Sequence, residues 1–314
     1  MDELVGQFNP SWNAAYFIVI HLSRKGLSDF IVRRLQEFTR LPCTLVREGQ
    51  LIEKGKIYIG IPNLHLILKN GHTRLGHGPA ENRWRPSIDV LFRSAAAAYD
   101  SRVTGIILTG LLDDGTSGMW AIKRSGGNCL VQDPAEAEYP DMPLSVLNRM
   151  EVDHCVTIDQ MGSVLSKLID KKTTKHLDIP ADVKAEAELA EKMASRIEGV
   201  QALGEQSPFT CPDCGGTLFQ VEKEKLDRFR CFTGHVYTQQ ALEVTQAENI
   251  ESTLWVALRM MEERKNLLLK MEMQTRERGF ERFAKEHRSK ADELQEHVDR
   301  LKQMLRITQE GDDT

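Results

Sequence analysis

The chain lacks the features that would assign it to a membrane-bound, secreted or nucleic-acid-binding class. No apolar run approaches the roughly 18 residues that span a bilayer, and Met1–Val5 has neither the basic nor the apolar stretch of a secretion signal. Basic residues are not in excess, because 41 Lys and Arg stand against 46 Asp and Glu, for a formal net charge of -5. Proteins that bind a nucleic-acid backbone usually carry a basic excess. We therefore expect a cytoplasmic protein without membrane insertion and without a nucleic-acid partner.

Cysteine is also scarce, with six in 314 residues. Cys43, Cys129 and Cys155 stand alone in apolar or strand-like runs, which predicts small buried side chains in a reducing compartment. The other three cluster near a histidine, and these four residues are Cys211, Cys214, Cys231 and His235.

The spacing within this cluster is C-x2-C, then sixteen residues, then C-x3-H. Thiolate and imidazole ligands in this number suit tetrahedral zinc, and Gly215–Gly216 lets the first pair turn tightly. The pattern predicts a closed, structural zinc ribbon over residues 208–247, with no organic cofactor. The alternative is that the three cysteines are unrelated core residues.

The most informative stretch that is present runs from Thr104 to Met119. Gly105–Thr109 is a short β-branched run typical of a strand buried on both faces, Gly110–Gly115 is a turn, and a helix follows. Similar strands and amphipathic helices alternate through residues 1–170, which predicts an α/β domain with a doubly wound, mainly parallel, Rossmann-like sheet. Ligands bind such sheets at the carboxyl ends of the strands. A phosphate cradle at 115–118 is a further interpretation, but it lacks the lysine of a P-loop.

The expected elements follow the apolar pattern and the turn residues. Asn70–Gly71 gives a strong hairpin signal between two short strands. The predicted strands are 16–20, 44–46, 57–61, 64–68, 73–75, 105–109, 128–132 and 156–158, and the predicted helices are 2–8, 26–38, 86–99, 116–124, 143–150 and 160–170.

Two polar residues follow predicted buried strands, His21 after the first strand and Asp114 in the turn after residues 105–109. A neutral imidazole held by a carboxylate is the base half of a nucleophilic triad, because the carboxylate fixes the tautomer and stabilises the imidazolium. Spacing alone also allows a packing histidine and an ordinary Asp-Asp-Gly turn.

Five motifs around these residues, in this order, resemble the catalytic domain of CheB-type protein-glutamate methylesterases. They are Val19–Ser23 (VIHLS), Gly55–Pro62 (GKIYIGIP), Asn82–Phe92 (NRWRPSIDVLF), Ile107–Gly115 (ILTGLLDDG), and Gln132–Pro134 with Met142–Pro143.

The resemblance implies a Ser-His-Asp triad that hydrolyses glutamate methyl esters on chemoreceptor helices and releases methanol. His21 would be the general base and Asp114 its orienting carboxylate. The amide of Leu111, where the family usually has Met, would contribute to the oxyanion hole. The residues expected to line the cleft are Asn82, Arg83, Arg85 and Ser87.

The sequence departs from the family at the nucleophile. The family's first strand and its Gly-Ala-Ser-x-Gly-Gly turn are not found here, and Asp2–Phe8 resembles a remnant of the helix that follows them. Ser11, Ser23 and Ser87 do not substitute, so catalysis by this mechanism should be lost. We expect a start-site error or a truncation, because an unpaired strand position leaves backbone groups unsatisfied. The rival interpretation is a non-catalytic signalling adaptor.

The remaining chain predicts a partly helical linker over 171–207, a helical hairpin over 248–308 that turns at Gly279, and a disordered tail over 309–314. A ribbon followed by a hairpin resembles the C-terminal extension of stand-alone members of this esterase group. The hairpin is interpreted as self-contained or as a homodimerising coiled coil, with docking to a receptor bundle as the alternative. Its methionines are predicted core residues: Met260, Met261, Met271, Met273 and Met304. The predicted apolar face of the second helix is Phe280, Phe283, His287, Ala291, Leu294, Val298, Leu301 and Leu305.

Overall fold

Six short strands in the first half of the chain pair in parallel, as the alternation of strands and helices predicts. The computed structural model describes residues 1–21, 28–170, 178–192, 204–221 and 227–312, and the chain divides into two compact units, Met1–Leu242 and Glu243–Thr314. In the first unit the parallel strands follow the orders β1-β3-β2 and β6-β7-β8. They are β1 (Tyr16–Ile18), β2 (Cys43–Leu45), β3 (Ile57–Ile59), β6 (Thr104–Ile107), β7 (Asn128–Gln132) and β8 (His154–Val156).

These strands form two three-stranded sheets in the described residues, rather than the one continuous sheet that was predicted. Ile18 of β1 and Ile106 of β6 pack against the same buried cluster, which contains Ile57 and Leu130. β1 and β6 therefore share side-chain packing without a hydrogen-bonded ladder between them. The mixed α/β fold with parallel strands is confirmed, and the single doubly wound sheet is corrected to two sheets over one core.

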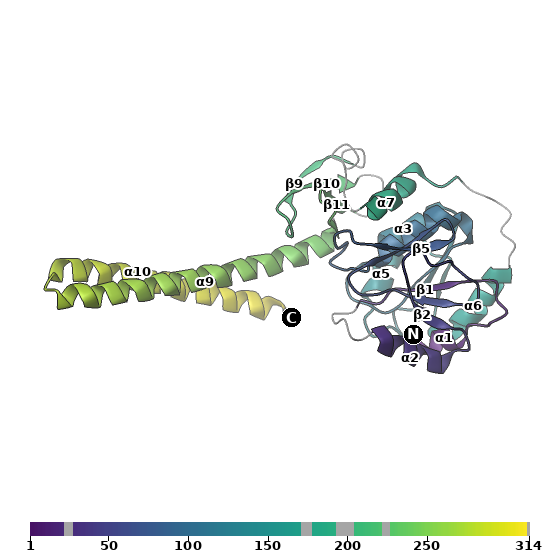
Figure 1. Cartoon of the computed structure of the whole chain (residues 1–314), viewed down its shortest axis with the longest axis horizontal. Helices are drawn as coiled ribbons and strands as arrows, with labels where there is room; N and C mark the ends of the chain where they lie inside the picture. The colour runs from purple at the N-terminus through teal and green to yellow at the C-terminus, as the bar shows by residue number, and fades with distance from the viewer. Residues whose placement is uncertain (22–27, 171–177, 193–203, 222–226, 313–314) are drawn as a thin grey trace. The chain divides into compact units, whose positions relative to one another are not determined.

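Helices cover both faces of the strands (Figure 1). In β3, Ile57 and Ile59 enter the cluster that contains α1 and α6 residues, whereas Tyr58 enters the cluster that contains α3 residues. Alternation of this kind is what the period of two along a strand requires. The helices are α1 (Asp2–Gly6), α2 (Ser28–Phe38), α3 (Ile88–Tyr99), α4 (Thr116–Arg124), α5 (Asp141–Arg149) and α6 (Ile158–Asp170).

A β-hairpin of β4 (His65–Lys69) and β5 (His72–Gly76) lies beside α3 and confirms the predicted turn. Asn70 and Gly71 adopt φ of 49° and 74°, left-handed values that these residue types tolerate best.

Two further elements of the first unit lie C-terminal to α6. Helix α7 (Ala181–Lys192) falls within the predicted linker and packs on the α/β part through Val183 and Ala190. An antiparallel sheet of order β12-β11-β10-β9 follows. Its strands are β9 (Gln206–Thr210), β10 (Thr217–Val221), β11 (Arg228–Cys231) and β12 (Val236–Thr238).

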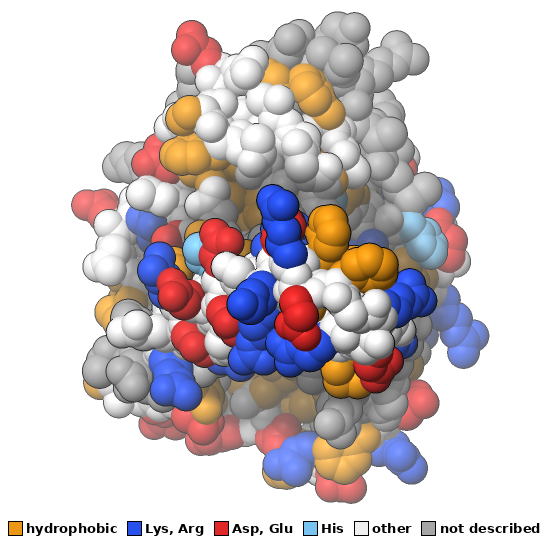
Figure 2. Space-filling view, turned by 90° about the vertical axis from the view of Figure 1, so that its left-hand side faces the viewer, with side chains coloured by type: hydrophobic (Ala, Val, Ile, Leu, Met, Phe, Trp, Pro, Cys, Tyr) orange, Lys and Arg blue, Asp and Glu red, His pale blue; other side chains and the backbone are white. Residues whose placement is uncertain are grey.

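Two long helices dominate the second unit, α9 (Gln239–Glu277) and α10 (Glu281–Asp312), with Gly279 at the turn with φ 82°. α9 begins nine residues before the predicted hairpin, and α10 runs four residues beyond its predicted end, over most of the predicted tail. Leu258 of α9 packs with Val298 and Leu305 of α10. Lys and Arg side chains lie among Asp and Glu around the turn, which faces the viewer in Figure 2. None of the described helices is long and apolar enough to cross a membrane.

Several side chains are more exposed than predicted, because two helices share only one seam. Phe280 and Phe283 are more than half exposed, and Ala284 takes the buried position instead. Met261 is half-buried, but four of the methionines predicted to fill the core are exposed: Met260, Met271, Met273 and Met304. Cys129 is buried as predicted and Cys43 is half-buried, whereas Cys155 is exposed on the short strand β8.

Candidate active site and metal centre

His21 and Asp114 meet at the carboxyl ends of β1 and β6. His21 follows the end of β1, and Asp114 lies in the loop between β6 and α4. The distance between His21 Nε2 and Asp114 Oδ2 is 2.8 Å, and the two side chains are 14% and 2% exposed. The structure therefore brings together the two residues that the sequence suggested as a base and its carboxylate.

Asp114 is held by donors from Asn82 and from the start of α3. Its carboxylate accepts hydrogen bonds from Ser87 Oγ at 2.8 Å, from Ile88 N at 2.7 Å and from Asn82 Nδ2 at 3.2 Å. Burial would raise the pKa of Asp114, but the hydrogen bond and charge of His21, with the Ile88 amide and the Ser87 hydroxyl, hold that pKa below its ordinary value. Asp114 is therefore a buried, ionised acceptor.

This arrangement fixes the tautomer of His21. An ionised carboxylate only accepts hydrogen bonds, so His21 Nε2 carries the proton, and in the neutral ring Nδ1 keeps its lone pair. The His21 ring also stacks on Trp84, with centroids 4.3 Å apart and planes at 6°. The carboxylate and the indole together hold the imidazole in one orientation, as a general base requires.

The three serines considered as nucleophiles do not complete the pair. Ser87 is fully buried and donates its hydroxyl hydrogen to Asp114, on the carboxylate side of the pair. Ser11 is exposed and donates to Asn9. Ser23 lies outside the described residues.

The predicted cleft residues divide into two groups. Asn82 and Ser87 contact Asp114 directly, whereas Arg85 donates to the carbonyl of Gly78 at 2.8 Å. Arg83 is half-buried, with φ 71°.

Leu111 is 59% exposed in the loop after β6, and none of the described residues accepts a hydrogen bond from its amide. The next residue, Leu112, has a φ of 62°, which is uncommon for a leucine and is typical of loops shaped for a function. Leu111 lies in the same loop as Asp114, and a backbone amide in such a loop can donate to a developing oxyanion.

Sequence reasoning missed part of the polar network around Asp114. Asp89 is buried and accepts from Gly118 N at 2.6 Å and from Asn82 Nδ2 at 2.8 Å, and burial with the nearby Asp114 charge raises its pKa. Asp113 is also buried and accepts from Thr238 Oγ1 at 2.8 Å. Because Asp89 occupies the Gly118 amide and residues 116–118 are buried, the phosphate-cradle interpretation is wrong.

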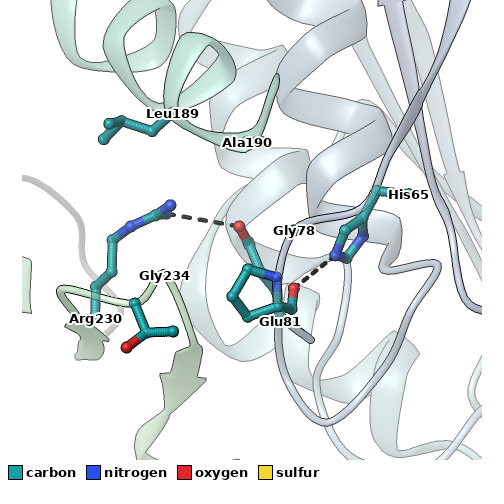
Figure 3. Close-up of a pocket in the computed structure, with 9 residues that line it drawn as sticks. His65, Gly78, Glu81, Leu189, Ala190, Arg230 and Gly234 are labelled. Atoms are coloured by element: carbon teal, nitrogen blue, oxygen red, sulfur yellow. Dashed lines mark hydrogen bonds and ion pairs between the residues drawn. The ribbon is translucent and has the colours of Figure 1, made fainter. Parts of the chain in front are cut away.

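A buried cluster of charges attaches α7 and the antiparallel sheet to the α/β part. Glu81 forms an ion pair with Arg93 of α3. It forms a second ion pair, at 3.6 Å, with Arg230 of β11 (Figure 3). Glu186 of α7 pairs with Arg228 at 2.7 Å and with Arg93 at 3.6 Å. Against the effect of burial, the arginines lower the pKa of Glu81, and they lower that of Glu186 to about 2. Both carboxylates are therefore ionised inside the protein.

The four predicted metal ligands converge at one end of the antiparallel sheet. One ligand atom from each of Cys211, Cys214, Cys231 and His235 lies within 4.8 Å of the others. Cys231 Sγ lies 3.7 Å from Cys214 Sγ and 3.5 Å from His235 Nδ1. Three sulfurs and one imidazole nitrogen in a shell of this size fit a tetrahedral zinc ion.

An imidazole oriented by a buried carboxylate, at the carboxyl ends of parallel strands, defines an α/β protein with a hydrolase-type site. Residues 1–165 match the family model described as CheB methylesterase, and the chain belongs to this family. A Leptospira interrogans protein, named putative protein-glutamate methylesterase/protein-glutamine glutaminase, is 33% identical over 152 residues, which are 48% of this chain and 78% of that protein.

Two further comparisons agree on the family. A Methanosarcina mazei protein, named protein-glutamate methylesterase/protein-glutamine glutaminase 2, is 30% identical over 177 residues, and the match covers 54% of this chain and 48% of that protein. The crystal structure of the Thermotoga maritima CheB methylesterase catalytic domain superposes with a TM-score of 0.50 at 26% identity, covering 54% of this chain and 89% of that domain. Enzymes with these names are hydrolases.

Proposed function

We propose that the α/β part of this chain serves the hydrolysis of glutamate methyl esters on chemoreceptor-type proteins, in a chemosensory pathway. The observation that carries the proposal is the bond between His21 and Asp114, placed at the strand ends of a CheB methylesterase-family domain. The names of the relatives provide the substrate class.

The chemistry assigned to each residue follows from the geometry. A hydroxyl attacks the ester carbonyl while Nδ1 of His21 takes its proton, and Asp114 stabilises the resulting imidazolium. The amide of Leu111 donates to the oxyanion of the tetrahedral intermediate. His21 then returns the proton to the leaving methoxide, which departs as methanol, and a water molecule hydrolyses the acyl-enzyme to give glutamate.

Neither Ser11 nor Ser87 supplies the attacking hydroxyl, because their hydroxyls bond to Asn9 and Asp114. We therefore expect the 314-residue chain alone to release no methanol from a methylated receptor. An otherwise identical chain, extended at residue 1 by a relative's strand and Gly-Ala-Ser-x-Gly-Gly turn, should release it.

Substitution of the pair provides the decisive comparison. In the extended chain, His21→Ala and Asp114→Asn should each lower kcat by about 10⁴-fold, whereas His154→Ala, on β8, should leave kcat nearly unchanged. A folded, extended chain that releases no methanol, or one that retains its rate after His21→Ala, contradicts the proposal.

A non-catalytic adaptor is the second candidate, and the positions of Ser87 and Ser11 favour it. Such a protein would bind receptor helices through the α/β part or the C-terminal module without hydrolysing them. The unextended chain would then bind a methylated receptor segment in calorimetry and leave its methyl esters intact. We further propose homodimerisation through α9 and α10, which light scattering of the full chain tests directly.

We also propose that the antiparallel sheet is a zinc ribbon in which Cys211, Cys214, Cys231 and His235 hold one structural ion. What supports this proposal is the convergence of three sulfurs and one imidazole nitrogen, the donor set that structural zinc takes. Elemental analysis should find one zinc per chain and none in Cys214→Ser. Full occupancy in that variant would contradict the assignment.

A further inference from the structure

We propose that the metal-bearing sheet positions the active-site carboxylate, and that Asn82 and Thr238 are the positioning residues that connect them. The inference rests on the proposed function, because it assigns these residues a role toward the esterase pair His21 and Asp114. It adds that the antiparallel sheet helps to position the residues of the site.

The first step runs from the metal ligands to the turn at residues 81–84. His235, a metal ligand, directly precedes β12 (Val236–Thr238). The carbonyl of Val236 accepts a hydrogen bond from Asn82 N at 2.8 Å, and Thr238 N donates to Asn82 Oδ1 at 3.1 Å. Both ends of β12 are therefore joined to Asn82 on the α/β part.

The second step runs from Asn82 to the carboxylates. Its Nδ2 donates to Asp114 Oδ1 at 3.2 Å and to Asp89 Oδ2 at 2.8 Å. The amide cannot be flipped, because its oxygen would then face two carboxylates and its nitrogen would face the N–H of Thr238. Asn82 is 2% exposed and has a φ of 50°, a backbone state that asparagine tolerates better than most residues.

The hydroxyl of Thr238 provides a second connection to the same loop. Thr238 Oγ1 donates to Asp113 Oδ1 at 2.8 Å and accepts from Ala241 N at 3.1 Å. One hydroxyl thus joins the residue before Asp114 to the first turn of α9, where it caps the helix. All of these groups are buried, so water does not replace a lost bond without rearrangement.

The two connections make metal binding and site geometry interdependent. Bound to one ion, His235 and Cys231 would be held together at the start of β12, and β12 contacts Asn82 and Asp113. If metal binding stabilises the contacts of Asn82, removing these contacts must in turn weaken metal binding. No hydrogen bond among the described residues joins Asn82 or Thr238 to His21, so both act through Asp114 and its loop.

The test uses the full, zinc-loaded chain and a signal that does not depend on turnover. The Nε2 proton of His21, shared with Asp114, gives a far-downfield proton NMR signal when the bond is ordered. Asn82→Gly removes the side-chain bonds without straining the positive φ, and Thr238→Val removes the hydroxyl. Both variants, and zinc removal by a chelator, should broaden or abolish the signal. Thr238→Ser, which keeps the hydroxyl, should restore it.

Thr217→Val is the matched control, because it changes β10 of the same sheet, and no described contact joins Thr217 to Asn82 or Asp113. It should keep the signal and the zinc affinity. Competition with a chromophoric chelator should show weaker zinc binding by at least about fivefold in Asn82→Gly, the lower limit of typical coupling between sites.

The proposal is overturned if the signal survives zinc removal, if both variants keep it, or if zinc affinity is unchanged in Asn82→Gly. It also fails if the zinc-loaded chain gives no such signal, or if Thr217→Val has the same effect as Thr238→Val. Failure of the esterase function is distinct, because it appears as a missing methanol release from the extended chain while this NMR and metal coupling persists.

Discussion

Replacing Glu186 of α7 by glutamine should detach this helix locally, because Glu186 is the carboxylate that joins α7 to two buried arginines. Its Oε1 lies 2.7 Å from Arg228 Nη2, and its Oε2 lies 3.6 Å from Arg93 Nε. Glutamine has the same shape but no charge, so it leaves the arginines with one carboxylate fewer in a buried site. Removing one partner of a buried ion pair typically costs about 3–5 kcal/mol.

The pKa of Glu186 indicates that its ion pairs contribute stability of the same order. Its pKa falls from the ordinary value of 4.5 to about 2, against the effect of burial, because Arg228 and Arg93 favour the ionised form. At 1.36 kcal/mol per pKa unit, this difference corresponds to about 3 kcal/mol of stability at neutral pH. Because the folded-state pKa is the lower one, this stability is complete above about pH 4.5 and is lost as the pH falls toward 2.

Hydrogen exchange of the α7 amides, residues 181–192, measures this loss directly. A change of about 3 kcal/mol should speed their exchange by about two orders of magnitude at pH 7. Glu188→Gln, on the exposed side of the same helix, should change the rate by less than about threefold. Equal exchange in Glu186→Gln and the parent chain would refute the idea that this ion pair holds α7.

Three further expectations follow from burial and contacts. Asp114→Asn removes the charge that accepts five hydrogen bonds and should lower the unfolding free energy of the first unit by about 3 kcal/mol in denaturant titrations; an unchanged midpoint would contradict its ionised, buried state. Leu258→Ala, in the seam of α9 and α10, should cost about 2–5 kcal/mol, whereas Leu267→Ala, 58% exposed, should cost under about 0.5 kcal/mol in thermal melts followed by circular dichroism. Iodoacetamide at pH 8 should label the exposed Cys155 well before the buried Cys129, because burial raises the pKa of Cys129 to about 12. Mass spectrometry of the labelled peptides measures the order, and labelling of Cys129 first would contradict its burial.

The parts of the fold that sequence predicted well are those set by local patterns. Asn70–Gly71 determines its hairpin turn through backbone preference alone. His21 and Asp114 could be paired because each follows a predicted strand, and the carboxyl ends of parallel strands point in the same direction. The four metal ligands could be predicted because their spacing along the sequence is typical of a zinc site.

Contacts between distant segments had no such signal. Thr238 contacts Asp113 across 125 residues of sequence, and Glu186 contacts Arg228 across 42. Parts of the intervening sequence have no clear helical or strand periodicity. The second helix of the hairpin shows a related difficulty. The larger Phe283 was predicted at the seam, but the seam repeats every seven residues as Ala284, Ala291, Val298 and Leu305. Small residues near the turn let the helices approach closely, and the bulky neighbour is left outside.

The way the antiparallel sheet is attached explains how it can serve as a positioning element. Among the described residues, its buried apolar cluster contains only its own side chains and the first turn of α9, and ion pairs and hydrogen bonds join the sheet to the α/β part. An apolar interface would tolerate small shifts, because dispersion and burial depend weakly on direction. Here, a shifted sheet would leave Arg228 and Arg230 unpaired in a buried site and would break both bonds of Asn82 to β12. The buried ion pairs therefore make a displaced sheet unfavourable, and the hydrogen bonds of Asn82 fix the position of the sheet relative to Asp114.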